Sequence, residues 1–557
     1  MRAQDMSLFE IASSFNCSTV EPPFRTNGVI RAGLRRECVR SWPSAKMELW
    51  CCRSRWLYTL RASSLRRRER EKERDRSDPL HQRECKRKLI AVRERLSVGG
   101  GEKARTPRIK SHDDSSEIMR TKSRVFENLR RDRPQVMDKV IPVAGDVTLP
   151  DFGISPEDLK LLCDSVSIVF NSAATVRFDE DLRTAVELNV KGPQRLMNIC
   201  HQMKRLEALV HVSTAYNNLD KESIEEVIYP TPITPRKLLE IVDCLDEDML
   251  TSITSKLVGK CPNTYAYTKA IAEQLLREEH GDIPLAIVRP STVTAALFEP
   301  MPGWIDNING PTGIIAGVGK GFLRVVRSSP DLVGDMIPVE FPIHLMLAVA
   351  WYTATHKSNE VKVYNCSTGD QNPLSWGEFR TIAFDAWMEK PGGDILWYPS
   401  ISFISSEWNY TIAAYIFHYI PAYIIDFLAR LLGKQPKLVR FYNKADRAMA
   451  CLNFYTIRQW RFISDNAIRL LDKMSAQDRE IFYFDVRQIN WRQYITNYVA
   501  GTKKYILKDN TPVEEAKIII KRFYWLQKAT QAILLLVVFF VGLRLFTWIF
   551  GGALQAT

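Results

Sequence analysis

The chain has 557 residues, of which 45% are hydrophobic and 25% charged, a composition typical of a folded protein with two or three domains. Its formal net charge of +13 is concentrated before residue 135, so it marks one segment and does not predict a nucleic-acid-binding protein. Eleven cysteines occur without any C-x-x-C pair, which argues against a zinc site or a disulfide framework and favours a reducing compartment.

Residues 1–122 show no sustained hydrophobic period. The basic run at 65–75 (LRRREREKERD) contains several acidic residues, whereas a transit peptide is poor in them. The glycines at 99–101 do not lie between an apolar strand and a helix, so they do not form a dinucleotide fingerprint. We expect residues 1–122 to be disordered or foreign to the native protein, with a basic arm as the functional alternative.

Strands and helices alternate from Val125 onward. The pattern predicts strands at 139–143, 166–170, 208–213 and 283–289, and helices at 155–163, 179–203 and 264–280. Short apolar strands separated by helices predict a Rossmann-like, doubly wound parallel sheet, in which a ligand lies beyond the carboxyl ends of the strands. Small or polar residues follow several of these strands: Asp146, Ala173, Ala174, Ser213, Thr214, Ser291 and Thr292.

The stretch 262–269 (PNTYAYTK) begins the last of these helices. Asn263 or Thr264 can cap it, and Tyr267, Ile271 and Leu275 recur every four residues as a buried stripe. Tyr265 and Lys269 lie one turn apart on one face. An ammonium group beside a phenol favours the phenolate and lowers its pKa, which suits the phenol for proton transfer to a carbonyl oxygen.

The Tyr-x-x-x-Lys spacing is weak on its own, and a surface pair is the alternative interpretation. It recurs at Tyr524 and Lys528, beside an apolar run. Only the pair at 265 follows a predicted strand that ends in Ser213–Thr214. The glycine-rich stretch 313–321 (GIIAGVGKG) fits neither a Walker loop nor a dinucleotide loop, so we predict a flexible loop there.

Two apolar stretches lie toward the carboxyl end. Residues 529–550 are long enough to span a bilayer, with Arg544 near one end. Lysine and arginine residues precede this run and no charge follows Phe550, so the catalytic part is predicted to be cytosolic. The stretch 412–432 contains His418, Pro421 and Asp426, and we interpret it as a buried or interfacial helix pair rather than as a span.

Several motifs occur together in order: GDVTLPDFGIS at 145–155, FNSAATVRFDEDL at 170–182, HVSTAYNN at 211–218, PNTYAYTKAIAEQL at 262–275 and IVRPSTVTAALFEPMPGWIDN at 287–307. With FHYIPAYIIDFLARLLGKQP at 417–436 and FDVRQINWRQYI at 484–495, this sequence resembles the alcohol-forming fatty acyl-CoA reductases, an extended branch of the short-chain dehydrogenase/reductases. The resemblance covers about two thirds of the chain, from Arg124 to Asp509.

The resemblance implies that a long-chain fatty acyl-CoA is reduced through an aldehyde to a primary alcohol with two NADPH, for lipid, wax or ether-lipid precursor synthesis. Tyr265 would then donate the proton and Lys269 would hold the nicotinamide ribose, while Thr214, or less favourably Ser213, would bind the substrate oxygen. The implied cofactor-binding residues are Asp146, Val147, Ala173, Ala174, Asn189, Lys269, Pro290, Ser291 and Thr292. Capping for Ser213 and Thr214 and helix packing for Asn189 are the structural alternatives.

The family begins with a central strand and a T-G-x-T-G-F-x-G-type loop that holds the cofactor pyrophosphate, and nothing in residues 1–122 matches them. The first β-α-β unit is therefore missing from the expected fold. We expect a partial reductase domain at 123–375, a mainly helical module at 376–510 and a single-pass anchor at 529–550, in the endoplasmic reticulum or peroxisome. A catalytically inactive membrane protein is the alternative, and a sugar-nucleotide or sterol enzyme is a third reading. The oligomeric state is left open.

Overall fold

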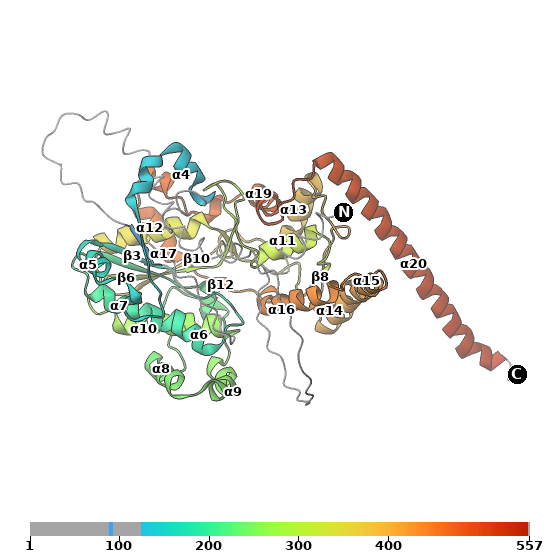
Figure 1. Cartoon of the computed structure of the whole chain (residues 1–557), viewed down its shortest axis with the longest axis horizontal. Coiled ribbons are helices and arrows are strands. Elements are labelled where there is room, and N and C mark those ends of the chain that lie inside the picture. Colours follow the sequence, from blue (N-terminus) through green and yellow to red (C-terminus); the bar gives the residue numbers. More distant parts are fainter. Residues whose placement is uncertain (1–88, 93–123, 555–557) are drawn as a thin grey trace, which may run out of the picture.

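The computed structural model describes residues 89–92 and 124–554, and a parallel sheet lies at its centre (Figure 1). Four strands are hydrogen-bonded in the order β10-β6-β4-β3: Lys362–Cys366, Leu285–Pro290, Ala208–Val212 and Ile168–Asn171. Every pairing in this sheet is parallel. The prediction of a Rossmann-like sheet is confirmed.

Helices cover both faces of the sheet because its strands are apolar on both sides. Leu209 of β4 packs with α7 and α10, while the next residue, Val210, belongs to the cluster that includes α12 on the other face. The bounds of the reductase-part helices are α4 Glu127–Asp132, α5 Pro156–Ser165, α6 Leu182–Val186, α7 Gly192–His201, α8 Pro235–Cys244, α9 Glu247–Val258, α10 Thr264–Glu279, α11 Pro311–Gly319 and α12 Glu340–Thr355.

A separate parallel pair joins β1 (Leu89–Val92) to β2 (Val140–Val143). This pair is not hydrogen-bonded to the four-stranded sheet, in which β3 is an edge strand and pairs only with β4 among the described residues. The expectation of disorder in residues 1–122 is wrong for β1. Four residues are too few to show a period, and their partner lies about fifty residues away in the sequence. The rest of 1–122 lies outside the described residues.

Most predicted elements form close to their expected positions. The helix expected at 179–203 forms as one run from Leu182 to His201, which consists of α6, a π-helical turn (η4, Glu187–Lys191) and α7. The π turn directly precedes Gly192 and Pro193, and Pro193 has no backbone N–H to donate to the α-helical hydrogen-bond pattern. The cap of α5 is confirmed, since the Ser155 side chain accepts a hydrogen bond from the Asp158 N–H.

The prediction of a flexible loop at 313–321 is also wrong. This stretch forms most of α11, whose residues Ile314 and Ile315 are buried in the main core. Glycine is needed here for close packing, because a Cβ at Gly319 would lie 2.3 Å from the ring of Trp387. The glycines therefore serve helix packing rather than chain flexibility.

The carboxyl-terminal part is mainly helical and docks on the reductase part. Its helices are α13 Trp376–Glu389, α14 Glu407–Ala414, α15 Ile420–Leu431, α16 Leu438–Thr456, α17 Asp465–Lys473, α18 Ala476–Ile481, α19 Trp491–Gly501 and α20 Val513–Leu554. Fully buried tyrosines of α19 make the contact: Tyr494 donates to the Ala295 carbonyl (2.8 Å), and the hydroxyls of Tyr498 and Thr312 lie 2.6 Å apart. Three short parallel pairs complete the fold: β5 Ser223–Ile224 with β12 Arg461–Phe462, β7 Thr292–Thr294 with β9 Met336–Pro338, and β8 Val325–Val326 with β11 Ser402–Phe403.

Two helices of the described residues are long and apolar enough to cross a membrane. One is α20, which extends away from the body (Figure 1) and contains the expected anchor. The other, Glu407–Leu431, is a single run of α14, a π-helical turn (η6, Tyr415–Tyr419) and α15. The expectation of a helix pair is corrected to one continuous run, in which the π turn directly precedes Pro421.

Candidate active site

Helix α10 places Tyr265 and Lys269 at the edge of the sheet. Asn263 caps the helix by accepting a hydrogen bond from the Ala266 N–H (2.9 Å). The stripe of Tyr267, Ile271 and Leu275 is buried against α6, α8 and α9, as the period predicts. On the adjacent face, Lys269 is only 3% exposed while Tyr265 remains partly exposed.

Lys269 reaches the carboxyl end of β4. Its Nζ donates to the Val212 carbonyl over 2.8 Å, so the ammonium lies directly before Ser213–Thr214. Burial, together with the nearby charge of Lys269, holds the pKa of His211 well below its usual value. His211 therefore stays neutral at physiological pH.

Ser213 and Thr214 are both buried and both form local hydrogen bonds. Thr214 Oγ1 accepts from the Tyr216 N–H (3.2 Å), and Ser213 Oγ accepts from Asn217 Nδ2 (3.4 Å). Thr214 therefore caps the short 3-10 helix η5 (Ala215–Asn217), as the capping alternative proposed. A hydroxyl that accepts such a bond keeps its own proton, so it can still donate to a substrate oxygen.

Asn189 joins the π turn η4 to α10. Its Nδ2 donates to the Thr175 carbonyl (3.2 Å) and to Thr268 Oγ1 (3.1 Å), next to Lys269. Asn189 is fully buried, and its Oδ1 has no hydrogen-bond partner among the described residues. A buried amide oxygen without a partner is costly and is well suited to accept from a water molecule or ligand.

An aromatic cluster of Phe178, Tyr455 and Tyr265 joins three parts of the chain at the site. The ring of Phe178 lies 5.7 Å from Tyr265 and 5.3 Å from Tyr455 of α16. Asn263 Nδ2 also donates to the Tyr455 hydroxyl (2.9 Å). Burial raises the pKa of Tyr455, which therefore stays protonated. The carboxyl-terminal part thus supplies one wall of the site, and no local sequence signal identified Phe178 or Tyr455.

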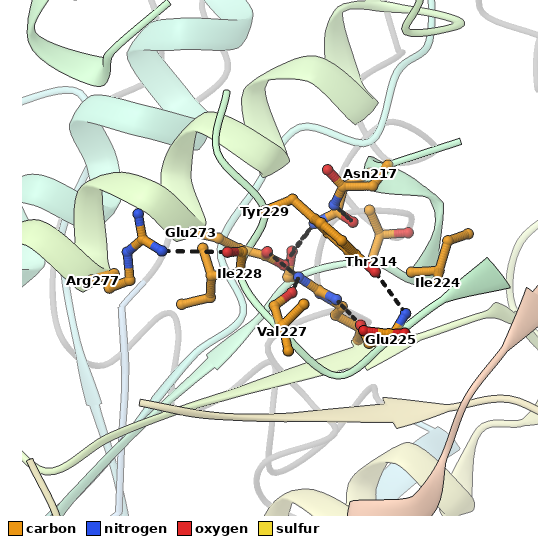
Figure 2. A network of polar contacts seen from close by, with 12 residues as sticks. Thr214, Asn217, Ile224, Glu225, Val227, Ile228, Tyr229, Glu273 and Arg277 are labelled. Atoms are coloured by element: carbon orange, nitrogen blue, oxygen red, sulfur yellow. Dashed lines mark hydrogen bonds and ion pairs between the residues drawn. The ribbon is translucent and has the colours of Figure 1, made fainter. Parts of the chain in front are cut away.

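A buried ion pair lies two turns after Tyr265 on α10 (Figure 2). Arg289 of β6 donates to both carboxylate oxygens of Glu273 at 2.8 and 2.6 Å, and the two side chains are 0% and 1% exposed. Glu273 also accepts from Asn217 Nδ2 (2.6 Å), while Arg289 donates to the carbonyls of Glu225 and Val227. The network links α10, β6 and the segment after Thr214. The sequence signal that could have found this network is the position of Glu273, which lies four residues after Lys269 and therefore on the same face of α10.

The remaining predicted cofactor residues lie at three strand ends. Ala173 and Ala174 follow β3, and Pro290, Ser291 and Thr292 lie at the end of β6, where the hydroxyls of Thr292 and Tyr216 are 3.1 Å apart. Asp146 and Val147 follow β2, and the Asp146 carboxylate accepts from the N–H and hydroxyl of Thr148. The sheet thus brings Lys269, Asn189 and Ser213–Thr214 together, whereas Asp146 and Val147 follow the separate β1–β2 pair.

Comparison with known proteins now identifies the family. Two family models described as male sterility protein match the chain, an NAD-binding one at residues 106–346 and a second at 417–509. Fatty acyl-CoA reductase 2 of Bos taurus is 41% identical over 409 residues, covering 72% of this chain and 78% of that protein. The chain belongs to the fatty acyl-CoA reductase family.

Other members of the family show similar identity. Fatty acyl-CoA reductase 1 of Xenopus laevis is 40% identical, covering 72% of this chain and 77% of the relative, and that of Homo sapiens is 38% identical, covering 69% and 75%. Among solved structures, the reductase domain of a nonribosomal peptide synthetase from Mycobacterium tuberculosis gives a TM-score of 0.48 at 17% identity, covering 82% of this chain and 90% of that one. The terminal R domain of the myxalamid pathway gives 0.44 at 13%, covering 72% and 84%.

Proposed function

We propose that this fatty acyl-CoA reductase converts a long-chain fatty acyl-CoA, through an aldehyde, to a primary fatty alcohol with NADPH. The observation that carries the proposal is the Lys269 Nζ contact with the Val212 carbonyl. It brings the ammonium to the strand end that bears Ser213–Thr214, while Tyr265 lies one turn away on the same helix.

The proposed chemistry needs a proton donor and groups that hold the carbonyl oxygen. Tyr265 donates the proton to that oxygen, and Thr214 donates a hydrogen bond to it, with Ser213 as the second candidate. Lys269 supplies a fixed positive charge beside the developing oxyanion. Phe178, which packs between Tyr265 and Tyr455, limits access of water to Tyr265.

The nicotinamide end of the cofactor fits the residues around Lys269. Lys269 Nζ and the unpartnered Asn189 Oδ1 offer a donor and an acceptor for hydroxyl groups, and Ala173–Ala174 and Pro290–Thr292 flank this edge. Asp146 and Val147 are proposed to lie near the adenine. NADPH, when bound, supplies the hydrides of the reaction.

We also propose the arrangement of the chain in the cell. Residues 123–375 form the reductase domain and 376–510 the helical module, with 529–550 as a single-pass anchor. Basic residues precede the apolar part of α20, which supports a cytosolic catalytic part. The endoplasmic reticulum or the peroxisome is the proposed membrane.

The test compares two tyrosine variants in a cofactor-loop chimera, in which residues 1–122 are replaced by the glycine-loop segment of a related reductase, expressed in cells supplied with fatty acid. Tyr265→Phe is expected to lower fatty alcohol formation at least 100-fold, a loss typical of removing a general acid, whereas Tyr524→Phe, in the same spacing on α20, leaves it nearly unchanged. Alcohol is measured by gas chromatography. Equal losses in the two variants would contradict the assignment of Tyr265.

A second candidate function is that of a membrane-bound family member without catalysis. The observation that favours it is that residues 1–122 contain no glycine-rich loop of the family type. Binding of NADPH to the purified chain, measured by fluorescence, discriminates the two candidates. Tight binding of NADPH by the chain supports the enzyme. The second candidate is supported if the chain does not bind NADPH but the chimera with a glycine-loop segment in place of residues 1–122 does.

A further inference from the structure

The helical run Glu407–Leu431 exposes a large apolar surface. Trp408 is 80% exposed and Leu432, one residue beyond the run, is 74% exposed. The members of this apolar patch are Trp408, Ile412, Tyr415, Ile416, Phe417, Ile420, Tyr423, Ile424, Ile425, Phe427, Leu428, Leu431 and Leu432. A surface of this size on a protein indicates a binding partner, because soluble proteins rarely leave such patches uncovered.

The opposite side of the same run is attached to the protein body along its length. Ala414, His418, Ala422 and Asp426, spaced four residues apart, are all buried. His418 Nε2 accepts from the Arg324 N–H (3.0 Å). A helix that lies lengthwise against the protein in this way cannot cross a bilayer by itself.

Asp426 ties the end of the run to α16. Its carboxylate accepts from three consecutive backbone N–H groups, those of Lys437, Leu438 and Val439, at 2.9 to 3.0 Å. A carboxylate bound at the start of a helix satisfies the N–H groups that would otherwise lack partners. Pulling the run away from the body to make a span would leave these groups and the Asp426 charge in hydrocarbon.

Helices α14 and α15, which carry the apolar patch, lie on the side of the protein from which α20 emerges (Figure 1). Three successive contacts link the run to α20. Arg324, whose N–H binds His418, also covers the ring of Trp397 at 5.0 Å. The ring of Trp397 in turn lies 6.4 Å from Phe523 of α20. A membrane reached by α20 is therefore close to the patch.

The charge around the patch also suits a membrane surface. Exposed basic residues lie from the last turn of α15 to the first turn of α16, at Arg430, Lys434, Lys437 and Arg440, and no acidic residue occurs from Phe427 to Phe441. Tryptophan and tyrosine side chains within the patch are of the type enriched at the membrane–water interface. Apolar side chains beside a basic cluster are typical of helices that lie in the plane of an anionic membrane.

We propose that the run Glu407–Leu431 is a second membrane contact, which lies in the plane of an anionic bilayer leaflet beside the point where α20 enters. The apolar patch inserts among the acyl chains, and the basic residues bind lipid phosphates. Helix α16 begins beside this contact and carries Tyr455 near its other end, about 26 Å along the helix axis, so it connects the contact to the candidate active site. The membrane contact does not depend on the proposed activity.

Photo-crosslinking of the full chain in sealed liposomes tests this inference. The probe is a phosphatidylcholine with a photoactivatable group in its acyl chain, in vesicles with or without 30% phosphatidylserine, about the content that gives a strong surface potential. Labelled peptides from 407–432 are expected, with several-fold more labelling when phosphatidylserine is present. The exposed helix α9 serves as the unlabelled control. Labelling of α20 without labelling of 407–432 would overturn the proposal.

Two further measurements separate insertion from other outcomes. The variant Ile424→Glu/Phe427→Glu, which changes only exposed side chains, is expected to lose labelling of 407–432 at least fivefold and to keep that of α20. Met249→Glu on α9 is the matched control. In intact vesicles with the catalytic part outside, a membrane-impermeant amine reagent should modify Lys434 and Lys437. Modification only after permeabilisation would show a span and overturn the in-plane arrangement.

Discussion

The buried pair of Glu273 and Arg289 allows a sharp test of the network behind the site. In Glu273→Gln the side chain keeps its shape, but the guanidinium of Arg289 loses its only carboxylate partner among the described residues at zero exposure. Breaking one side of a buried pair costs about 3–5 kcal/mol, because an uncompensated charge remains in the interior. The amide oxygen of the introduced glutamine can still accept one hydrogen bond from Asn217 or Arg289, so the expected loss of unfolding free energy is near the lower end of this range.

The assay is chemical unfolding of the detergent-purified protein, followed by tryptophan fluorescence. A matched control is Glu240→Gln, which breaks the exposed pair with Arg236 on α8 and should cost less than about 0.5 kcal/mol. The double variant Glu273→Leu/Arg289→Met removes both charges and should recover much of the stability. It should not recover turnover, because Asn217 loses its Glu273 acceptor and the carbonyls of Glu225 and Val227 lose their Arg289 donor.

The argument about buried charge would be refuted by a loss below about 1 kcal/mol in Glu273→Gln. Full activity in the stable double variant would show instead that the network stabilises the fold without orienting the Ser213–Thr214 segment. These two outcomes concern separate steps, since unfolding reports the buried charge and turnover reports the position of the strand end.

Other parts of the molecule give further predictions. Gly501→Ala should cost about 1–3 kcal/mol or more in unfolding experiments, because its Cβ would lie 1.7 Å from the Gly303 carbonyl oxygen; unchanged stability would contradict this packing. Burial lowers the pKa of His344 to about 4, so the neutral imidazole stabilises the fold fully above pH 6.5, and this stability is lost as the pH falls toward 4. His344→Gln should reduce that loss of stability in acid by roughly 3 kcal/mol, and a pH profile of stability identical to that of the unchanged protein would contradict this. Removing residues 523–557 should release the chain from membranes at alkaline pH in carbonate extraction, and retention with the integral fraction would show that the stretch 412–432 spans the bilayer. Tyr455→Phe should lower stability by about 1 kcal/mol through loss of the Asn263 hydrogen bond, whereas no change would show that this bond is not formed.

The amino-acid sequence alone determined the features that depend on local chemistry. Asn263 and the stripe of Tyr267, Ile271 and Leu275 predicted α10, because capping and helical period act within a few residues. The apolar strands followed by Ser213–Thr214 predicted a common edge for the candidate site, because parallel strands end on the same side of a sheet. The composition of α20 was enough to predict a membrane anchor.

Tertiary structure decided the features that depend on distant partners. The glycines of α11 form a helix because Trp387 fills the space beside Gly319, which no local pattern records. Tyr455 reaches the active-site helix at Asn263 across 192 residues of sequence. The helix at 407–431 is apolar by composition, but only its packing shows which side contacts the protein and which side is exposed. The physical reason is the same in each case: burial is a property of the neighbours that folding brings together, whereas sequence patterns report the preferences of a segment on its own.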